Sequence, residues 1–274
     1  MSRWPKHPFF AALRVPLGPG CDSGGMPRTS PVLRVAAVAI TAIATMVCVA
    51  PSAQAASLHV GDASQKTTRP AFLAPYGMAD TGGGSQLITV VGPRFGSRDG
   101  LLIWWQQVGD SWQEVDRTPA RFGWNGLKLG TARHERSNTT PTGLFSLPFA
   151  FGKAANPGTA MPYRKIRWNT YWCSDSRSHV YNRWRTGLPS DCQAARAEHM
   201  TKFATYVYGL ATGFNYANPV PGRGSAIFVH AFGAAYTAGC VSIKRRALVR
   251  LLQWLSPASN PHIAIGTNST IGAL

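Results

Sequence analysis

Two residues of this chain, His230 and Cys240, have the types of a base and its nucleophile, and they are ten residues apart. A cysteine reacts as its thiolate, and a free thiol with a pKa of about 8.5 is mostly protonated at neutral pH. A neighbouring imidazole removes that obstacle by accepting the proton. Gly239, just before the cysteine, lets the backbone approach a substrate carbonyl closely. The pair therefore predicts acyl transfer through a cysteine.

Two short apolar segments must position this pair. His230 follows the apolar run at residues 226–229, which predicts a buried strand, and Cys240 follows a Thr-Ala-Gly turn. We expect the amides of Gly239 and Cys240 to hold the oxyanion. Plainer interpretations remain open: a histidine on an apolar strand is often a core residue, and a buried thiol is often inert.

The rest of the domain has the pattern of short strands separated by turns. Residues 86–91, 101–107, 112–115 and 262–265 are apolar and rich in β-branched or aromatic types. Such runs, spaced by Gly and Asp, predict an all-β sandwich or barrel.

Two helices are also predicted. The first begins at Ser190 or Asp191 as N-cap and runs to Phe203, which would place His199 on a helix near the cleft. The second covers residues 242–255, with leucines on one face.

The first 55 residues have the composition of a secretory signal peptide. Residues 35–50 carry no charge, Arg28 and Arg34 precede them, and Ala53 and Ala55 have the spacing that a signal peptidase reads. We expect translation to begin at Met26 and the mature chain near residue 56. Residues 56–85 predict a flexible linker, and residues 86–274 the functional domain, with no membrane span once the signal is cleaved.

Removing the signal peptide changes the cysteine count. Cys21 and Cys48 would be lost, leaving three cysteines in an exported chain. Cys173 and Cys192 flank a turn-rich loop and predict a disulfide, which would contribute about 3 kcal/mol through the unfolded state. Cys240 is left unpaired, as a nucleophile must be.

The net charge of the chain limits the kinds of partner that it can bind. The chain has a net charge of +17, and residues 1–55 hold five Lys or Arg and one Asp, so +13 remains after their removal. In an exported protein this excess favours anionic wall polymers or lipid headgroups rather than nucleic acid. The one dense run, residues 244–246, is typical of a solvated helix face.

Two motifs now carry a resemblance to a known family. Thr237-Ala238-Gly239-Cys240, with His230 upstream, resembles the active-site motif of the L,D-transpeptidase catalytic domain, also called the YkuD domain. The usual motif there is a histidine, a spacer and then Ser/Thr-His-Gly-Cys. The segment Thr-Pro-Thr-Gly-Leu-Phe at residues 140–145 looks like the family's Thr-Pro-x-Gly-x-Phe signature. The resemblance spans about residues 86–266.

The resemblance implies a mainly β, sandwich- or barrel-like domain with two or three peripheral helices. It implies a peptidoglycan stem peptide as substrate, Cys240 as the residue that forms a thioester and His230 as the base. Gly239 and Thr237 would line the site, with His199 and Ser242 beside it. No metal ion and no organic cofactor are expected.

The sequence departs from the family motif at three points. Ala238 replaces the family histidine, Ser242 replaces the usual Arg or Asn, and the His-to-Cys spacer is shorter than usual. A shorter spacer implies a shorter loop over the site. Without the Arg, the site lacks one group that could bind a carboxylate of the substrate.

Two alternatives stay open at the level of sequence. Release of the same thioester to water would make the protein an L,D-carboxypeptidase or another hydrolase. A catalytically silent wall-binding module with the same fold is the alternative from another class, and a disulfide to Cys240, or a buried and separated Cys240–His230 pair, would favour it.

Overall fold

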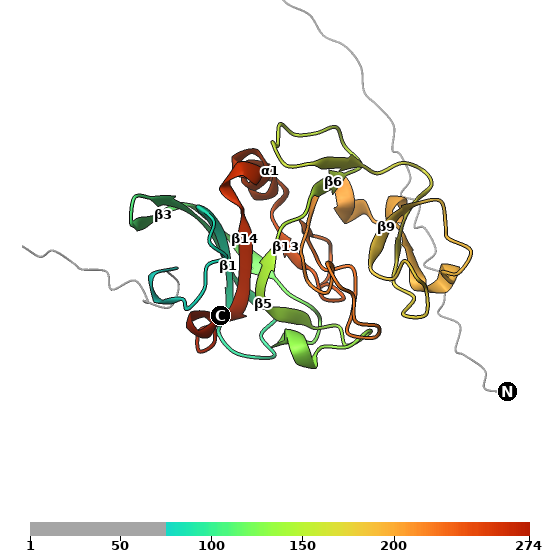
Figure 1. Ribbon diagram of the computed structural model, residues 1–274, viewed down its shortest axis with the longest axis horizontal. Helices are drawn as coiled ribbons and strands as arrows, with labels where there is room; N and C mark the ends of the chain where they lie inside the picture. Colours follow the sequence, from blue (N-terminus) through green and yellow to red (C-terminus); the bar gives the residue numbers. More distant parts are fainter. Residues whose placement is uncertain (1–74) are drawn as a thin grey trace, which may run out of the picture. The chain divides into compact units, whose positions relative to one another are not determined.

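The computed structural model describes residues 75–274, which form two β-sheets, one α-helix and several short 3-10 turns (Figure 1). The chain divides into two units, Met1–Asp62 and Ala63–Leu274, and all described residues belong to the second. The predicted signal peptide, the start at Met26 and residues 56–74 of the predicted linker lie outside the described residues.

Within residues 75–274, the larger sheet has eleven strands and the smaller sheet three. The strand order is β4-β5-β14-β1-β2-β3-β13-β12-β11-β6-β7 in the larger sheet and β10-β8-β9 in the smaller. The larger sheet comprises β1 (Gln86–Gly92), β2 (Asp99–Val108), β3 (Ser111–Arg121), β4 (Leu127–Leu129), β5 (Thr140–Ser146), β6 (Ala150–Gly152), β7 (Tyr163–Lys165), β11 (Gly209–Ala211), β12 (Phe228–Ala231), β13 (Val241–Ile243) and β14 (His262–Thr267). The smaller comprises β8 (Thr170–Cys173), β9 (Arg183–Thr186) and β10 (Ala197–His199).

The mainly β fold class is confirmed. Strands β1, β2, β3 and β14 contain the four apolar runs that predicted strands, and they are neighbours in the larger sheet. Strand β1 is buried along its whole length, between β2 on one side and β14 on the other. A strand covered on both faces needs a mainly apolar run, which residues 87–91 supply, and the buried Thr89 accepts a hydrogen bond from Trp105 Nε1 at 2.9 Å.

The helix predictions had mixed outcomes. Helix α1 (Arg245–Trp254) confirms the second one, although it begins later than expected because Ser242 belongs to strand β13. The first prediction, residues 190–203, was wrong: this segment forms two 3-10 turns with β10 between them. Strand β10 pairs with β8, so the backbone N–H and C=O groups of this segment bond to a neighbouring strand. In a helix they would have bonded to one another.

In residues 75–274, α1 is therefore the one α-helix, where two or three helices were predicted. The 3-10 turns are η2 (Pro75–Gly77), η3 (Gly130–Ala132), η4 (Ala194–Arg196), η5 (Met200–Lys202), η6 (Ala204–Val207), η7 (Pro257–Ser259) and η8 (Ile271–Ala273).

The residues just before β1 are hydrogen-bonded to the end of the chain. The Ala79 amide donates to Gly272 O at 3.0 Å, and the Asp80 amide donates to Leu274 O at 2.8 Å. The Ser85 amide donates to Ser259 O at 2.9 Å. The described part of the predicted linker thus follows the surface of the domain.

Strands β12 and β13 are parallel neighbours, and their two faces have different surroundings. On one face Val229, Ala231, Val241 and Ile243 pack into the main core together with the leucines of α1. On the other face Phe228 and Cys240 pack into an aromatic cluster that includes Trp172 of β8. Side chains alternate along a strand, so each strand contributes to both layers.

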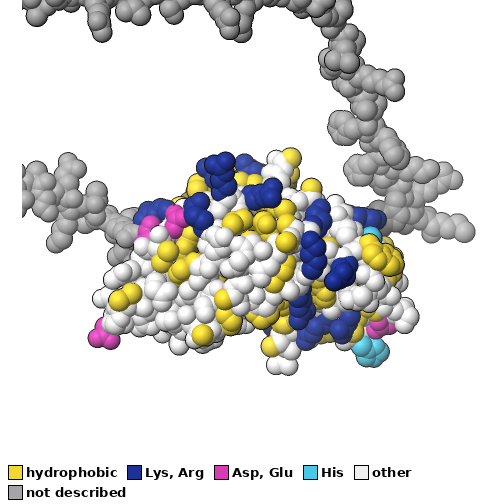
Figure 2. Space-filling model, turned by 90° about the horizontal axis from the view of Figure 1, so that it is seen from above, with side chains coloured by type: hydrophobic (Ala, Val, Ile, Leu, Met, Phe, Trp, Pro, Cys, Tyr) yellow, Lys and Arg dark blue, Asp and Glu magenta, His cyan; other side chains and the backbone are white. Residues whose placement is uncertain are grey.

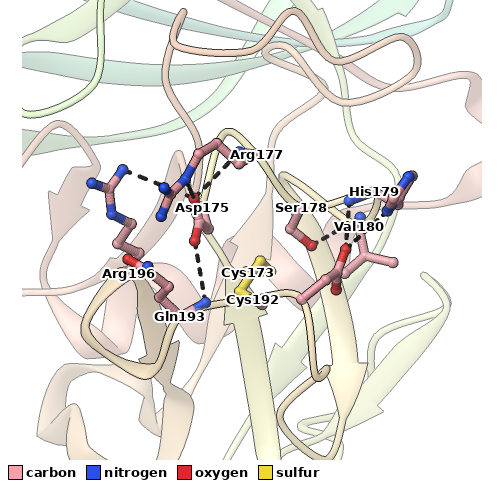
Figure 3. A network of polar contacts seen from close by, with 10 residues as sticks. Cys173, Asp175, Arg177, Ser178, His179, Val180, Cys192, Gln193 and Arg196 are labelled. Atoms are coloured by element: carbon pink, nitrogen blue, oxygen red, sulfur yellow. Dashed lines mark hydrogen bonds and ion pairs between the residues drawn. A yellow bond between two sulfur atoms is a disulfide. The ribbon is translucent and has the colours of Figure 1, made fainter.

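A disulfide joins Cys173 at the end of β8 to Cys192, as the sequence predicted. Around it, Asp175 accepts hydrogen bonds from the amides of Arg177 and Gln193, both at 3.2 Å (Figure 3). Burial disfavours the charge of Asp175, but these bonds and the Arg177 side chain outweigh burial and lower its pKa. The covalent and polar links together fix the loop that leads to β10.

Positive charge is spread over several parts of the face shown in Figure 2, with acidic groups mainly toward its ends. Lys244, Arg245 and Arg246 at the start of α1 are exposed, which agrees with a solvated helix face. None of the helices in the described part of the chain has the length and apolar character needed to cross a membrane.

Candidate active site

A cavity of about 770 Å³ brings together the two residues that the sequence marked as nucleophile and base. Cys240 and His230 both line it, together with Tyr206 of η6 and Glu198 of β10. The cavity is of the size that small-molecule and peptide sites usually have.

The register of β12 and β13 places these side chains on one face. His230 lies opposite Ser242, and Val229 lies opposite Val241. Cys240 is two residues before Ser242, so Cys240, Ser242 and His230 share the face opposite the main core. This arrangement follows from the alternation of apolar and reactive residues in the two segments.

Cys240 is a buried free thiol. Its Sγ donates to Ala226 O at 3.2 Å and accepts from the Phe228 amide at 3.4 Å. Burial raises its pKa to about 12, the charge of Glu198 adds to this, and the Phe228 amide and Arg133 oppose it. Cys240 is therefore a neutral thiol in the resting protein.

His230 is buried and held in one tautomer. Its Nδ1 lies 2.8 Å from Ala231 O, and because a carbonyl only accepts, Nδ1 carries the proton. Burial lowers its pKa to about 4, against the opposing effect of that hydrogen bond. The ring is thus neutral at physiological pH, and Nε2 is left as the basic nitrogen.

Both partners are neutral, so the site does not hold a ready-made thiolate–imidazolium pair. The Cys240 thiol donates to Ala226 O rather than to the imidazole, so a base would have to take its proton as the sulfur attacks a carbonyl. A neutral pair is also compatible with a buried site, where an unpaired charge would be costly.

The turn before Cys240 is fixed by Thr237. Its hydroxyl donates to Cys240 O at 2.6 Å and accepts from the Gly239 amide at 3.1 Å. Gly239 has φ +142°, and a Cβ there would lie 2.8 Å from Thr139 O, so only glycine fits. Since the Gly239 amide is already occupied, the Cys240 amide is the better oxyanion donor of the two that the sequence suggested.

The Thr-Pro-Thr-Gly segment meets the cysteine turn directly. Thr140 Oγ1 lies 3.4 Å from Cys240 O and accepts a hydrogen bond of 2.8 Å from the Gly123 amide. Two motifs that are 100 residues apart in the chain therefore support the same turn.

The segment before β12 is positioned by Asn182, which lies in the loop between β8 and β9. Its Oδ1 accepts from the amide of Ala226 at 3.0 Å and from Trp172 Nε1 at 2.9 Å. Ala226 has φ +55°, an unfavourable conformation for alanine, and its carbonyl is the acceptor for the Cys240 thiol. A strained residue held by its neighbours is a common feature of functional sites.

Comparison with known proteins places this chain in a family. The family model of the L,D-transpeptidase catalytic domain, YkuD, matches residues 107–265. The chain belongs to this family.

Other comparisons add little to the family match. No curated protein matches the sequence. A solved structure, Bdellovibrio bacteriovorus Bd1075, is similar at 16% identity with a TM-score of 0.34, over 66% of this chain and 47% of that one. The chain thus spans about half the length of that protein.

Two other residues that the sequence singled out, His199 on the predicted first helix and Ser242 after the cysteine, lie differently. His199 is on β10, where its ring stacks on Tyr171 at 4.6 Å and its Nε2 contacts Trp168 O, and it does not line the cavity. Ser242 is fully buried opposite His230, and its Oγ has no hydrogen-bond partner among residues 75–274.

Three cavity residues were not found from the sequence. Tyr206 contacts the His230 ring edge-on at 5.4 Å and donates to Glu198 Oε2 at 2.8 Å. Arg133 is buried, donates from Nε to Thr139 O at 2.8 Å, and interacts electrostatically with Cys240. One feature of the sequence could have pointed to Glu198: the chain has only 11 acidic residues, and this one is adjacent to His199.

No group of three or more His, Cys, Asp or Glu residues in the part of the chain that the structure describes is arranged to hold a metal ion.

Proposed function

We propose that this protein is an exported L,D-transpeptidase that acts on peptidoglycan stem peptides, with Cys240 as nucleophile and His230 as base. The observation that carries the proposal is the shared cavity: the two side chains lie on one face of β12 and β13 and line the same pocket. Cys240 is also the free cysteine among residues 75–274, since Cys173 and Cys192 pair with each other.

In the first half-reaction, Cys240 Sγ attacks the carbonyl between an L- and a D-residue of the stem while His230 Nε2 takes the thiol proton. The Cys240 amide stabilises the oxyanion, an effect of about 3 kcal/mol for a well-aimed donor. His230 then gives its proton to the departing amine, and a thioester remains.

In the second half-reaction, an amine of another stem attacks the thioester and forms the new peptide bond. Water in place of the amine would give a carboxypeptidase. Arg133, Arg136 and Arg196 line the cavity, so the free carboxylates of a stem peptide would meet positive charge there.

Export is part of the proposal. The disulfide between Cys173 and Cys192 is the kind of bond that persists in oxidising compartments. The leader at residues 1–55 would be removed near residue 56, with translation from Met26, and the basic domain would remain near anionic wall polymers. N-terminal sequencing of the precursor and of the exported protein tests both boundaries.

The decisive experiment is mass spectrometry of the intact protein after incubation with a carbapenem, which acylates an activated cysteine. We expect one adduct on Cys240 and none on the Cys240→Ala variant. Incubation with a disaccharide-tetrapeptide then distinguishes transfer from hydrolysis by the mass of the product. A wild-type protein that forms no adduct with either reagent would favour the non-catalytic wall-binding module.

A further inference from the structure

Glu198 lies in the wall of the candidate active site, and the nucleophile–base chemistry makes no use of it. It is on β10, opposite Trp172 of β8, and lines the cavity with Cys240 and His230. Carboxyl groups are seldom placed in such surroundings without a partner or a role.

The two oxygens of Glu198 have different surroundings. Oε2 accepts the Tyr206 hydroxyl at 2.8 Å, and the Tyr206 ring contacts His230 edge-on. Oε1 has no hydrogen-bond partner among residues 75–274. Of the described side-chain atoms that are fully enclosed, only Ser242 Oγ lacks a partner, so Oε1 keeps some exposed surface, and Glu198 lines the cavity. The carboxyl is thus held by Tyr206, which itself contacts His230, and its second oxygen makes no hydrogen bond within residues 75–274.

The second carboxyl of the cavity, Glu135, differs from Glu198. Glu135 Oε1 accepts the hydroxyls of Tyr181 and Ser225, each at 2.7 Å, and its charge acts on Arg133. The negative charge of Glu198, by contrast, acts on Cys240 and raises the pKa of its thiol. Glu198 is therefore the carboxyl that is coupled to the reacting sulfur.

Burial raises the pKa of Glu198 to about 7, with a smaller contribution from Glu135 and an opposing one from Tyr206. The other charged or titratable groups that line the cavity are Arg133, Arg136, Arg196, His230, Tyr236 and Cys240. A carboxyl with this proton affinity can take up and release a proton near neutral pH.

The second half-reaction requires such a group. A primary alkyl amine, like the Lys side chain with a pKa of about 10.4, is almost entirely protonated at neutral pH. An ammonium group has no lone pair, so it must lose a proton before it attacks a thioester. The amine loses two protons in all, and the one free nitrogen of His230 carries the proton that returns to Cys240 Sγ, so a second base is needed for the other proton.

We propose that Glu198 is the acceptor-amine site: its carboxylate binds the ammonium group of the acceptor and takes one proton from it, next to the Cys240 thioester. This inference rests on the proposed function and deepens it. It assigns the acceptor as a cationic primary amine, and Tyr206 as the residue that positions the carboxyl.

The step balances as follows. The ammonium gives one proton to Glu198 Oε1, and its nitrogen lone pair forms the C–N bond to the thioester carbonyl. The C–S bond breaks, its electron pair returns to Cys240 Sγ, and the sulfur takes the second proton of the nitrogen through His230. The products are an amide, a neutral thiol and a protonated Glu198.

The test measures the two half-reactions separately with the purified exported protein. Acylation by a disaccharide-tetrapeptide is followed by intact-protein mass spectrometry. The thioester is then offered either a second tetrapeptide with a free side-chain amine or hydroxylamine, which is uncharged at neutral pH. The ratio of transfer to hydrolysis is recorded for each nucleophile.

For Glu198→Gln we expect acylation at least as fast as in the wild type, because a negative charge near the thiol is removed. Transfer to the tetrapeptide amine should fall by about 100-fold, a usual effect of losing a general base. Transfer to hydroxylamine should not change. The matched control Glu135→Gln, which keeps an acceptor oxygen for Tyr181 and Ser225, should behave as wild type with both nucleophiles.

Equal transfer to the tetrapeptide amine by Glu198→Gln and wild type would overturn the inference while leaving the proposed function intact. Absence of any thioester in the wild type would instead remove the proposed function. If Glu198→Gln does not fold, the pH profile of the wild type decides: transfer to the amine should rise up to about pH 7 and then stay level, because the reacting form is an ionised Glu198 with a bound ammonium. A rate that keeps rising tenfold per pH unit toward the amine pKa of about 10.4 would refute the role of Glu198, because the amine would then lose its proton to solvent.

Discussion

The two faces of strands β12 and β13 carry side chains of opposite character. Toward α1, every side chain is apolar, and Val229, Val241 and Ile243 are completely buried in the main core. On the other face, His230 and Cys240, which lies just before β13, line the cavity, and Ser242 is fully buried opposite His230.

The difference shows how a buried polar site is kept in place. On the apolar face, burial itself stabilises the fold, by about 25 cal/mol for each Å² of apolar surface removed from water. On the cavity face, burial keeps His230 and Cys240 neutral and leaves the Ser242 hydroxyl without a partner. The rigid apolar face holds the strands in a register that the polar face would not favour by itself.

The largest effect is expected when the proton acceptor on the cavity face, His230, is removed. His230→Ala should slow carbapenem acylation of Cys240 by about 10²- to 10⁴-fold, because the thiol loses its proton acceptor. The rate is measured by time-resolved mass spectrometry. Urea unfolding should show a loss of about 1–3 kcal/mol, because a buried ring and its hydrogen bond to Ala231 O are removed, so the rates are compared on folded protein. Unchanged acylation would mean that another group is the base.

The second prediction concerns the apolar face, which packs against α1. Leu251→Ala removes a fully buried side chain of α1 from the main core and should lower the free energy of unfolding by about 2–5 kcal/mol. Urea titration measures this. Arg246→Ala, on the exposed side of the same helix, should change stability by less than about 0.5 kcal/mol. The folded fraction of Leu251→Ala should still form the Cys240 adduct, and an inactive folded form would mean that the two faces are not separable.

A smaller effect concerns the unpartnered hydroxyl. Ser242→Ala removes a buried polar atom that makes no hydrogen bond, so stability should stay constant or rise by about 1 kcal/mol. Ser225→Ala is the matched change, because Ser225 Oγ donates to Glu135, and it should lower stability by about 1 kcal/mol. Thermal unfolding of both variants compares them. A clear loss of stability in Ser242→Ala would show that the hydroxyl has a partner in solution.

The smallest effect is the pH dependence of acylation. A free thiol reacts faster as the pH rises toward its pKa of about 8.5. The pKa of Cys240 is raised to about 12 and that of His230 is lowered to about 4, so both stay neutral over the physiological range. As Glu198 ionises near pH 7, its charge makes the thiol harder to deprotonate, and acylation should slow by about two- to threefold. Carbapenem acylation rates at several pH values test this, with a small free thiol as reference; a rise that follows the free thiol would contradict it.

Local pattern was enough for much of the fold. The apolar runs at residues 86–91 and 262–265 became β1 and β14, and the leucine-rich face predicted α1. Residues 190–203 were not predictable in this way, because their N-cap and composition favour a helix in isolation. Pairing of β10 with β8, next to the disulfide, overrides that preference.

Some residues of the candidate site could likewise be predicted from the sequence, and others could not. His230, Cys240, Gly239 and Thr237 belong to a short motif that is visible in the sequence. Glu198 was missed because its role depends on strand alternation: in β10 it faces the cavity, whereas the neighbouring His199, which the sequence favoured, stacks on Tyr171 outside the cavity.

By itself, the sequence determined the family, the mainly β class, the disulfide between Cys173 and Cys192, and the pair that would carry the chemistry, because residue types and local spacing encode these properties. Only the tertiary structure decided the protonation of that pair and the presence of Glu198, Tyr206 and Arg133 around it. Burial and the proximity of charges set those properties, and both depend on segments that lie far apart in the chain.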